Sequence, residues 1–139
     1  MLEAQAVSDQ PLSAEAIRAA LDKGLARKFS GKDVLVLIPD HTRSIPLPQL
    51  FRMMVEVLSD AGKLDFMVAL GTHPPLDEAA LLKLVGISHD ERLTHYGWVG
   101  LHNHSWDQAD SLEQIGVLTL DRIKEIAGAA WHPSLGGDV

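Results

Sequence analysis

Two short polar segments hold the side chains that are best suited to chemistry. Residues 40–43 follow the apolar run 34–38, and residues 71–73 follow the apolar run 66–70. If these runs are neighbouring parallel strands, both polar segments lie at one edge of the sheet, where open α/β sheets bind small ligands. The spacing therefore predicts that a carboxylate, a guanidinium and an imidazole converge on one site.

Each of these groups suits a particular role at such a site. The planar fork of Arg43 can bind a carboxylate or phosphate through two parallel hydrogen bonds, so we expect it to clamp a substrate anion. His73 carries an imidazole, the side-chain type that serves most often as a general acid or base. Asp40 is placed to orient either of them. The hydroxyls that could hold a phosphate, together with N–H groups of the turns, belong to Thr42, Ser44 and Thr72.

Purely structural roles compete with this interpretation. Asp40 and Thr42 follow a strand, where Asp and Thr are common turn and cap residues. Arg43 could instead pair with Glu56 or Asp65 at the surface, where such a pair contributes only ~0–1 kcal/mol. The functional interpretation therefore depends on both polar segments lying at the same sheet edge.

Further histidines suggest an alternative of another class. His102 and His104 are two residues apart, so on a strand they share a face, and with His73 they could supply three imidazoles to a metal ion. A zinc-dependent hydrolase is the corresponding alternative function, although this spacing alone is a weak signal. His89 and His95 are expected in a loop.

Helix signals surround the two polar segments. Ser13 is expected to cap a helix whose apolar residues recur every four positions as far as Phe29, with Gly31 at its end. A second helix is predicted from near Pro48 to Gly62. A third should begin after the cap residue Asp77 and end at Gly86, and residues 121–127 read as a short final helix.

The apolar runs predict a parallel sheet. Residues 34–38 and 66–70 lack polar alternation, which favours strands covered on both faces, and residues 98–102 read as a third strand. Strand, helix and strand in this order form a right-handed βαβ unit by default. We therefore predict an α/β fold in which a βαβ-type parallel sheet is flanked by helices.

Composition limits the class of protein. A chain of 139 residues suits a single domain with a real core, predicted over residues 13–128 between an N-terminal arm (1–12) and a flexible C-terminal end (129–139). The formal charge of −7 argues against a nucleic-acid partner, and the longest apolar run is too short for a membrane helix. With no cysteine and no signal-peptide pattern, we expect a cytoplasmic protein.

The two polar segments and two later ones resemble a known family. Residues 40–46 (DHTRSIP) and 69–75 (ALGTHPP) are similar, in order and separation, to motifs in the N-terminal domain of nickel-dependent lactate racemases and their relatives. Residues 101–106 (LHNHSW) and 112–116 (LEQIG) also look like the family. The resemblance covers residues 13–128, and it departs from the family at Ser44, where proline is usual, and at Pro74, where many members have arginine.

The resemblance implies a chemistry. In the family, this domain faces a second domain across a cleft that holds a nickel pincer nucleotide, whose ring exchanges hydride with a 2-hydroxy acid. It implies that Arg43 contacts the substrate carboxylate, that His73 is one of two histidines that take and return the hydroxyl proton, and that Asp40 supports them. No metal ligand is expected among these residues.

The family's second histidine, cofactor-tethering lysine and nickel ligand lie further along than this chain extends. We therefore expect half of a site, inactive alone and not retaining the cofactor. It would be a fragment, a subunit completed by a C-terminal racemase domain or second polypeptide, or a stand-alone domain that binds a small anion. Because cutting the sheet leaves an edge uncovered, we also expect the isolated chain to form a homo-oligomer.

Overall fold

The computed structural model describes residues 11–71, 73–132 and 134, which fall into two compact units. The first unit extends to Ser105 and the second begins at Trp106. This division lies inside the range 13–128 that the sequence assigns to one domain, so that assignment stays a prediction. The predicted arm (1–12) and C-terminal end (129–139) fall largely outside the described residues.

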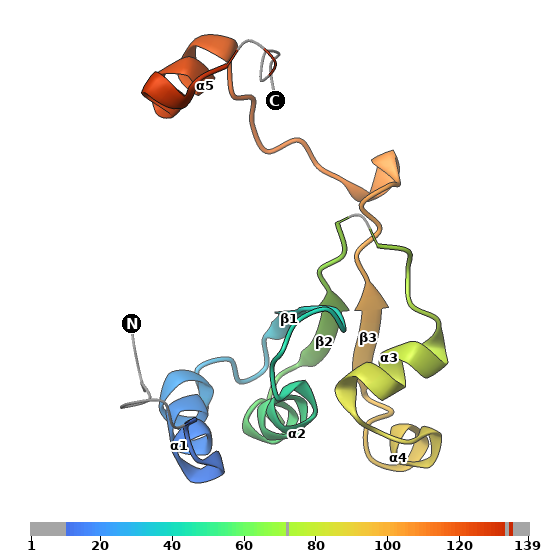
Figure 1. Ribbon diagram of the computed structural model, residues 1–139. Coiled ribbons are helices and arrows are strands. Elements are labelled where there is room, and N and C mark those ends of the chain that lie inside the picture. The colour runs from blue at the N-terminus through green and yellow to red at the C-terminus, as the bar shows by residue number, and fades with distance from the viewer. Residues whose placement is uncertain (1–10, 72, 133, 135–139) are drawn as a thin grey trace. The chain divides into compact units, whose positions relative to one another are not determined.

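The first unit contains a parallel sheet and four helices (Figure 1). Its strands are β1 (Asp33–Ile38), β2 (Lys63–Val68) and β3 (Val99–Asn103), and its helices are α1 (Ala14–Leu25), α2 (Leu47–Val57), α3 (Glu78–Val85) and α4 (His89–Thr94). The second unit contains α5 (Leu120–Ala127) and the short 3₁₀ turns η1 (Ala109–Ser111) and η2 (Gly128–Ala130). No helix among the described residues is long and apolar enough to cross a bilayer.

The three strands are parallel, in the order β1-β2-β3. Ile38 is paired with Val68, and Val68 with Asn103, so the three carboxyl ends lie level at one edge. The predicted α/β class and parallel sheet flanked by helices are confirmed. The segments that follow β1, β2 and β3 therefore begin side by side.

One face of the sheet carries the core of the first unit. Phe66 on β2 is fully buried against Phe51 of α2, with ring centroids 4.8 Å apart, and Val85 of α3 closes the same cluster. The opposite face is open within this unit, because Leu35 and Leu37 of β1 are 55% and 62% exposed. The prediction that β1 is covered on both faces is therefore wrong for the first unit.

Local hydrogen-bonding chemistry accounts for most helix ends. Ser13 caps α1 and Asp77 caps α3, each accepting a hydrogen bond from a backbone N–H three residues later. The predicted extension of the first helix to Gly31 is wrong, because Arg27 has a φ of 61° and turns the chain out of the helix, leaving Phe29 beyond its end. A repeat every four residues does not reveal such a turn.

Helix α4 covers the region around His89 and His95, so the loop predicted there is wrong. Ser88 and Glu91 form a reciprocal capping box at its start, which is the signal that was overlooked. Glu91 also accepts a hydrogen bond from Arg52 of α2 at 2.9 Å, and Arg52 donates to the carbonyl oxygen of Gly86 at 2.8 Å. Arg52 thus joins α2 to the segment that links α3 and α4.

Gly86 is a position where only glycine fits. Its φ is 70°, and an added Cβ would lie 2.5 Å from Cβ of Pro48 in α2. Gly24 in α1 has no neighbouring atom within 4 Å of such a Cβ. We expect Gly86→Ala to lower the free energy of unfolding by more than ~1 kcal/mol, and Gly24→Ala to raise it by ~0.5–1 kcal/mol. Urea unfolding followed by circular dichroism measures both, and equal midpoints for the two variants would contradict this account.

Candidate functional site

The turn after β1 is closed by hydrogen bonds to the side chain of Asp40. Its Oδ1 accepts hydrogen bonds from the backbone N–H of Thr42, at 3.0 Å, and from the Thr42 hydroxyl. This is the local turn that an Asp two residues before a Thr favours, and it leaves Asp40 only 9% exposed. One carboxylate oxygen is therefore occupied locally, and Oδ2 is free to reach another segment.

Oδ2 reaches the segment after β2. It lies 2.6 Å from Nδ1 of His73, a residue 33 positions away in the chain. An ionised carboxylate can only accept, so Nδ1 donates the hydrogen and Nε2 keeps the lone pair of the neutral ring. The His73 side chain is half exposed, whereas Asp40 is buried. The pair thus presents an oriented imidazole to solvent.

The hydrogen bonds to Asp40 also determine its charge. The Thr42 hydroxyl, the Thr42 backbone N–H and then His73 lower the pKa of Asp40 from 3.8 to about 2. The carboxylate consequently stays negative at neutral pH and stabilises the imidazolium that forms when His73 accepts a proton at Nε2. Geometry and charge together suit His73 to proton transfer.

Arg43 lies beside this pair. Asp40, Arg43 and His73 line one hollow of about 470 Å³ at the carboxyl edge of the sheet, with Thr42 and Gly71. Its size falls within the range of small-molecule sites. The arrangement therefore brings together the carboxylate, guanidinium and imidazole that the sequence predicts.

The surface partners that might have occupied Arg43 are engaged elsewhere. Glu56 pairs with Arg18, and Asp65 pairs with Lys63 at 2.7 Å. Among the residues that the structure describes, no hydrogen bond or ion pair engages the Arg43 guanidinium. Its five N–H donors are available to a ligand in the hollow.

The three residues whose hydroxyls are predicted to hold a phosphate are not all found in this hollow. The hydroxyl hydrogen of Thr42 is donated to Asp40, so Thr42 has none left for a phosphate oxygen. Ser44 is exposed and is not among the residues that line the hollow. Thr72 lies outside the described residues. The described part of the site thus suits a substrate better than it suits a cofactor phosphate.

The three histidines of the zinc alternative have separate partners. His102 Nε2 lies 3.2 Å from Asp65 on the open sheet face, whereas His104 Nδ1 lies 3.0 Å from the carbonyl oxygen of Leu70. Within the described ranges, no three His, Asp or Glu side chains are placed to hold a metal ion. The geometry gives the zinc hydrolase no support.

A further histidine, His41, lies near His73 although the sequence did not single it out. The ring of His41, in the same turn as Asp40, has its centroid 6.4 Å from that of His73. Its position inside the DHTR segment could have indicated a place in the site. His41 is exposed, and it lines a separate hollow with Leu76 rather than the one that Arg43 and His73 line.

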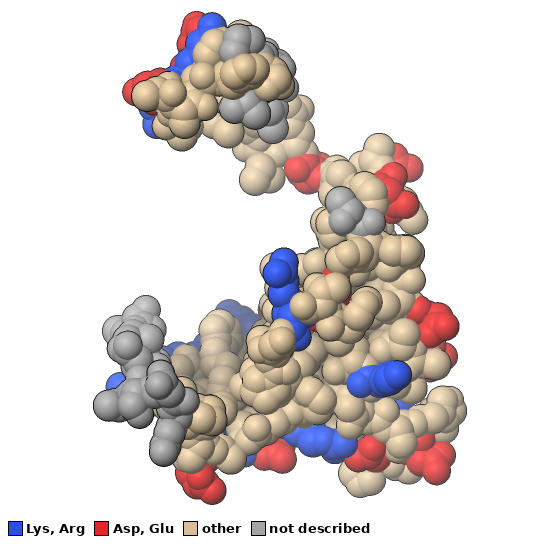
Figure 2. Space-filling view, in the orientation of Figure 1, with Lys and Arg blue, Asp and Glu red and all other residues tan. Residues whose placement is uncertain are grey.

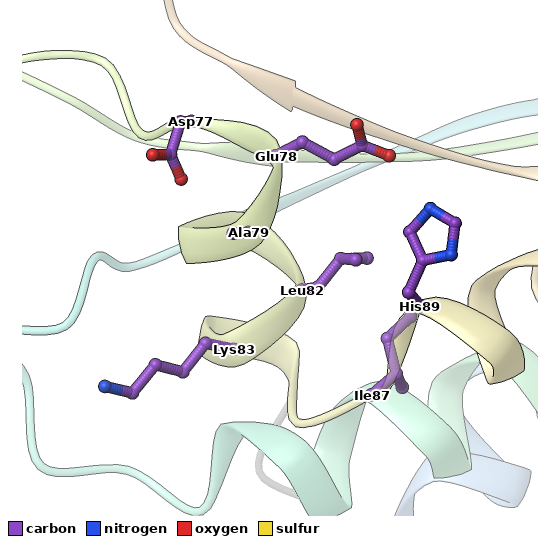
Figure 3. A pocket seen from close by; sticks show the side chains of 7 residues that line it. All are labelled: Asp77, Glu78, Ala79, Leu82, Lys83, Ile87 and His89. Carbon is purple, nitrogen blue, oxygen red and sulfur yellow. The ribbon is translucent and has the colours of Figure 1, made fainter.

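A second hollow, of about 700 Å³, lies between α3 and α4 (Figure 3). Leu82 and Ile87 give it an apolar lining, and Figure 3 shows Leu82, Glu78 and His89 on one side of α3, with the Lys83 side chain extending to the other side. None of the polar residues of the two turns lines it. Charged side chains of both signs are scattered on the face that Figure 2 draws.

The low pKa of Asp40 has a consequence for stability. A carboxyl whose folded-state pKa is depressed stabilises the fold above pH 3.8, and this contribution is lost as the pH falls towards 2. Glu91 contributes in the same way, because the Ser88 backbone N–H and Arg52 lower its pKa to about 2. Asp40→Asn and Glu91→Gln should each make the free energy of unfolding fall less steeply between pH 4 and pH 2.

Urea unfolding at a series of pH values measures these slopes, and the double variant should show the flattest one. A wild-type slope in Asp40→Asn would contradict the assignment.

Comparison with known proteins places the chain in a family. Residues 1–128 match the model of the lactate racemase N-terminal domain. A crystal structure of a protein from Thermotoga maritima is similar, with a TM-score of 0.69 and 26% sequence identity. The match covers 88% of this chain and 28% of that one, so this chain spans under a third of its structural relative. No curated protein matches. The chain belongs to the lactate racemase N-terminal domain family.

Proposed function

We propose that this chain supplies the substrate clamp and one proton-transferring base of a 2-hydroxy-acid racemase or epimerase. The observation that carries the proposal is the 2.6 Å contact between Asp40 and His73, which directs Nε2 of His73 away from Asp40 in a hollow that Arg43 also lines. Membership of the lactate racemase N-terminal domain family supports the same chemistry. A small 2-hydroxy acid has the carboxylate and hydroxyl groups that these two side chains recognise.

The roles follow from the chemistry of each group. Arg43 holds the substrate carboxylate through paired N–H donors, which fixes the substrate in the hollow. His73 then takes the hydroxyl proton at Nε2 while the C2–H bond would break with its hydride passing to a carrier, and the negative Asp40 stabilises the imidazolium. The hydroxyl group is restored when a hydride returns to C2 and the oxygen takes back the proton from Nε2. Inversion also requires a hydride carrier, a role that the family resemblance assigns to the nickel pincer nucleotide.

The described residues of this chain do not by themselves fit that cofactor. No lysine lines the hollow with Arg43 and His73, and the Thr42 hydroxyl is already committed to Asp40. We propose that a C-terminal racemase domain or a second subunit holds the cofactor and completes the site. The isolated chain is then inactive and oligomeric, and it works in the cytoplasm as part of a larger enzyme.

A stand-alone domain that binds a small anion is the second candidate. It is favoured by one observation, the absence of a described partner for the Arg43 guanidinium beside a hollow of about 470 Å³. The two candidates differ in one respect that can be measured. A racemase half-site contributes a proton-transferring group to a completed enzyme, whereas a binding domain does not.

Substitution of His73 in the completed, cofactor-loaded enzyme tests the first candidate. His73→Asn keeps a polar side chain but removes the titrating group, so kcat should fall by ~10²–10⁴ with little change in KM. Chiral chromatography of D-lactate and L-lactate measures the interconversion. His102→Asn is the matched control, because His102 pairs with Asp65 outside the hollow, and it should retain activity. An active His73→Asn enzyme would refute the proton-transfer role.

Substitution of Arg43 tests the clamp. Arg43→Lys keeps the positive charge but loses the paired donors, so kcat/KM should fall by an amount equivalent to ~1.5–3 kcal/mol. Arg18→Lys changes an arginine that pairs with Asp22 and Glu56 instead, and it should have no such effect. Equal kcat/KM values for Arg43→Lys and Arg18→Lys would show that Arg43 does not bind the substrate.

A further inference from the structure

The segment that carries His73 is held at both ends by two consecutive residues at the end of β3, the strand next to β2. Asn103, the last residue of β3, bonds to Leu76, which lies after His73 in the chain. His104 bonds to Leu70, which lies before it. The segment between these two attachment points is the one that brings the imidazole to Asp40.

The side chain of Asn103 makes two hydrogen bonds to the backbone of Leu76. Its Oδ1 accepts from the backbone N–H of Leu76 at 3.0 Å, and its Nδ2 donates to the carbonyl oxygen of Leu76 at 2.8 Å. A side-chain amide carries both a donor and an acceptor, so it satisfies the N–H and the carbonyl oxygen of one backbone residue together. Asn103 thus fixes the orientation of the Leu76 backbone as well as its position.

The contact of His104 is directional. The carbonyl oxygen of Leu70 can only accept, so Nδ1 of His104 donates the hydrogen, over 3.0 Å. The backbone N–H of His104 donates to the carbonyl oxygen of Val68 at 3.0 Å, which continues the pairing of β2 with β3 by one residue. Leu70 itself is 4% exposed. His104 therefore rests on a rigid, paired backbone.

We propose that Asn103 and His104 are positioning residues that hold His73 against Asp40. A segment fixed at both ends has fewer conformations to lose when the 2.6 Å hydrogen bond forms, so the bonded state is more populated. The proposal rests on the proposed function only in taking His73 as the base. It also gives a role to the LHNHSW motif, whose two imidazoles had suggested a metal site.

The tautomer of His73 reports this positioning directly. With its hydrogen bond to Asp40 in place, neutral His73 carries its hydrogen on Nδ1, and release of that bond lets the hydrogen move to Nε2. The ¹⁵N chemical shifts of the ring nitrogens distinguish the two forms and can be read through the non-exchanging ring protons of the full ¹⁵N-labelled chain in alkaline buffer. We expect the Nδ1–H form to predominate in the wild type.

Two variants remove the attachments with little change in side-chain volume. His104→Phe keeps a ring but loses the N–H donor, and Asn103→Leu keeps the branched shape but loses both hydrogen bonds. Each should shift His73 towards the Nε2–H form. His104→Asn, whose amide can donate to the Leu70 carbonyl oxygen, should restore the wild-type tautomer, and His102→Phe should leave it unchanged. Backbone amide spectra show whether each variant is folded.

The possible results separate two claims. A dominant Nδ1–H form that persists in folded His104→Phe and Asn103→Leu overturns the positioning role and leaves the proposed function standing. A wild type that lacks the Nδ1–H form overturns the Asp40–His73 pair and with it the proposed function. If one of the two variants fails to fold, the tautomer in the other decides the positioning role, because each removes one of the two attachments of the same segment.

Discussion

The Asp40 carboxylate joins the two turns of the site. One oxygen is bound within its own turn by Thr42, and the other binds His73 from the next strand. A buried carboxylate is costly unless hydrogen bonds satisfy it, and here each oxygen accepts at least one. The same bonds lower the pKa of Asp40, keep it negative and orient the imidazole. Loss of this group would release both turns at once.

The parallel sheet makes that contact possible. Because β1, β2 and β3 end level with one another, Asp40, His73 and His104 all follow strand ends at one edge. Residues far apart in the sequence then need only short turns to meet. The turn after β2 is also joined to the end of β3, because Asn103 bonds to Leu76 and His104 bonds to Leu70.

Much of this arrangement could be predicted where the signal is local. Ser13 and Asp77 as helix caps, Gly86 as a helix end, and the positions of Asp40 and His73 after apolar runs all depend on residues a few positions apart. Such effects are encoded in short stretches of sequence, and the structure agrees with them. The family resemblance, which rests on the same motifs, is confirmed.

Other features depend on contacts between distant residues and could not be predicted. The apolar run of β1 does not show which face the helices cover, so the exposure of Leu35 and Leu37 was missed. No periodic pattern in the sequence indicates that Asn103 makes two hydrogen bonds to the backbone of Leu76. The imidazole of His104 is equally suited to a metal or to a carbonyl oxygen, and only the geometry distinguishes these uses.

The most direct test of the central claim is a crystal structure of the completed, cofactor-loaded enzyme with a bound 2-hydroxy acid. The account predicts that the ligand carboxylate lies within hydrogen-bonding distance of the Arg43 guanidinium. It also predicts that the ligand hydroxyl contacts Nε2 of His73 while Nδ1 remains bonded to Asp40. A 2-hydroxy acid bound with its carboxylate away from Arg43, or with its hydroxyl out of reach of His73, would contradict it.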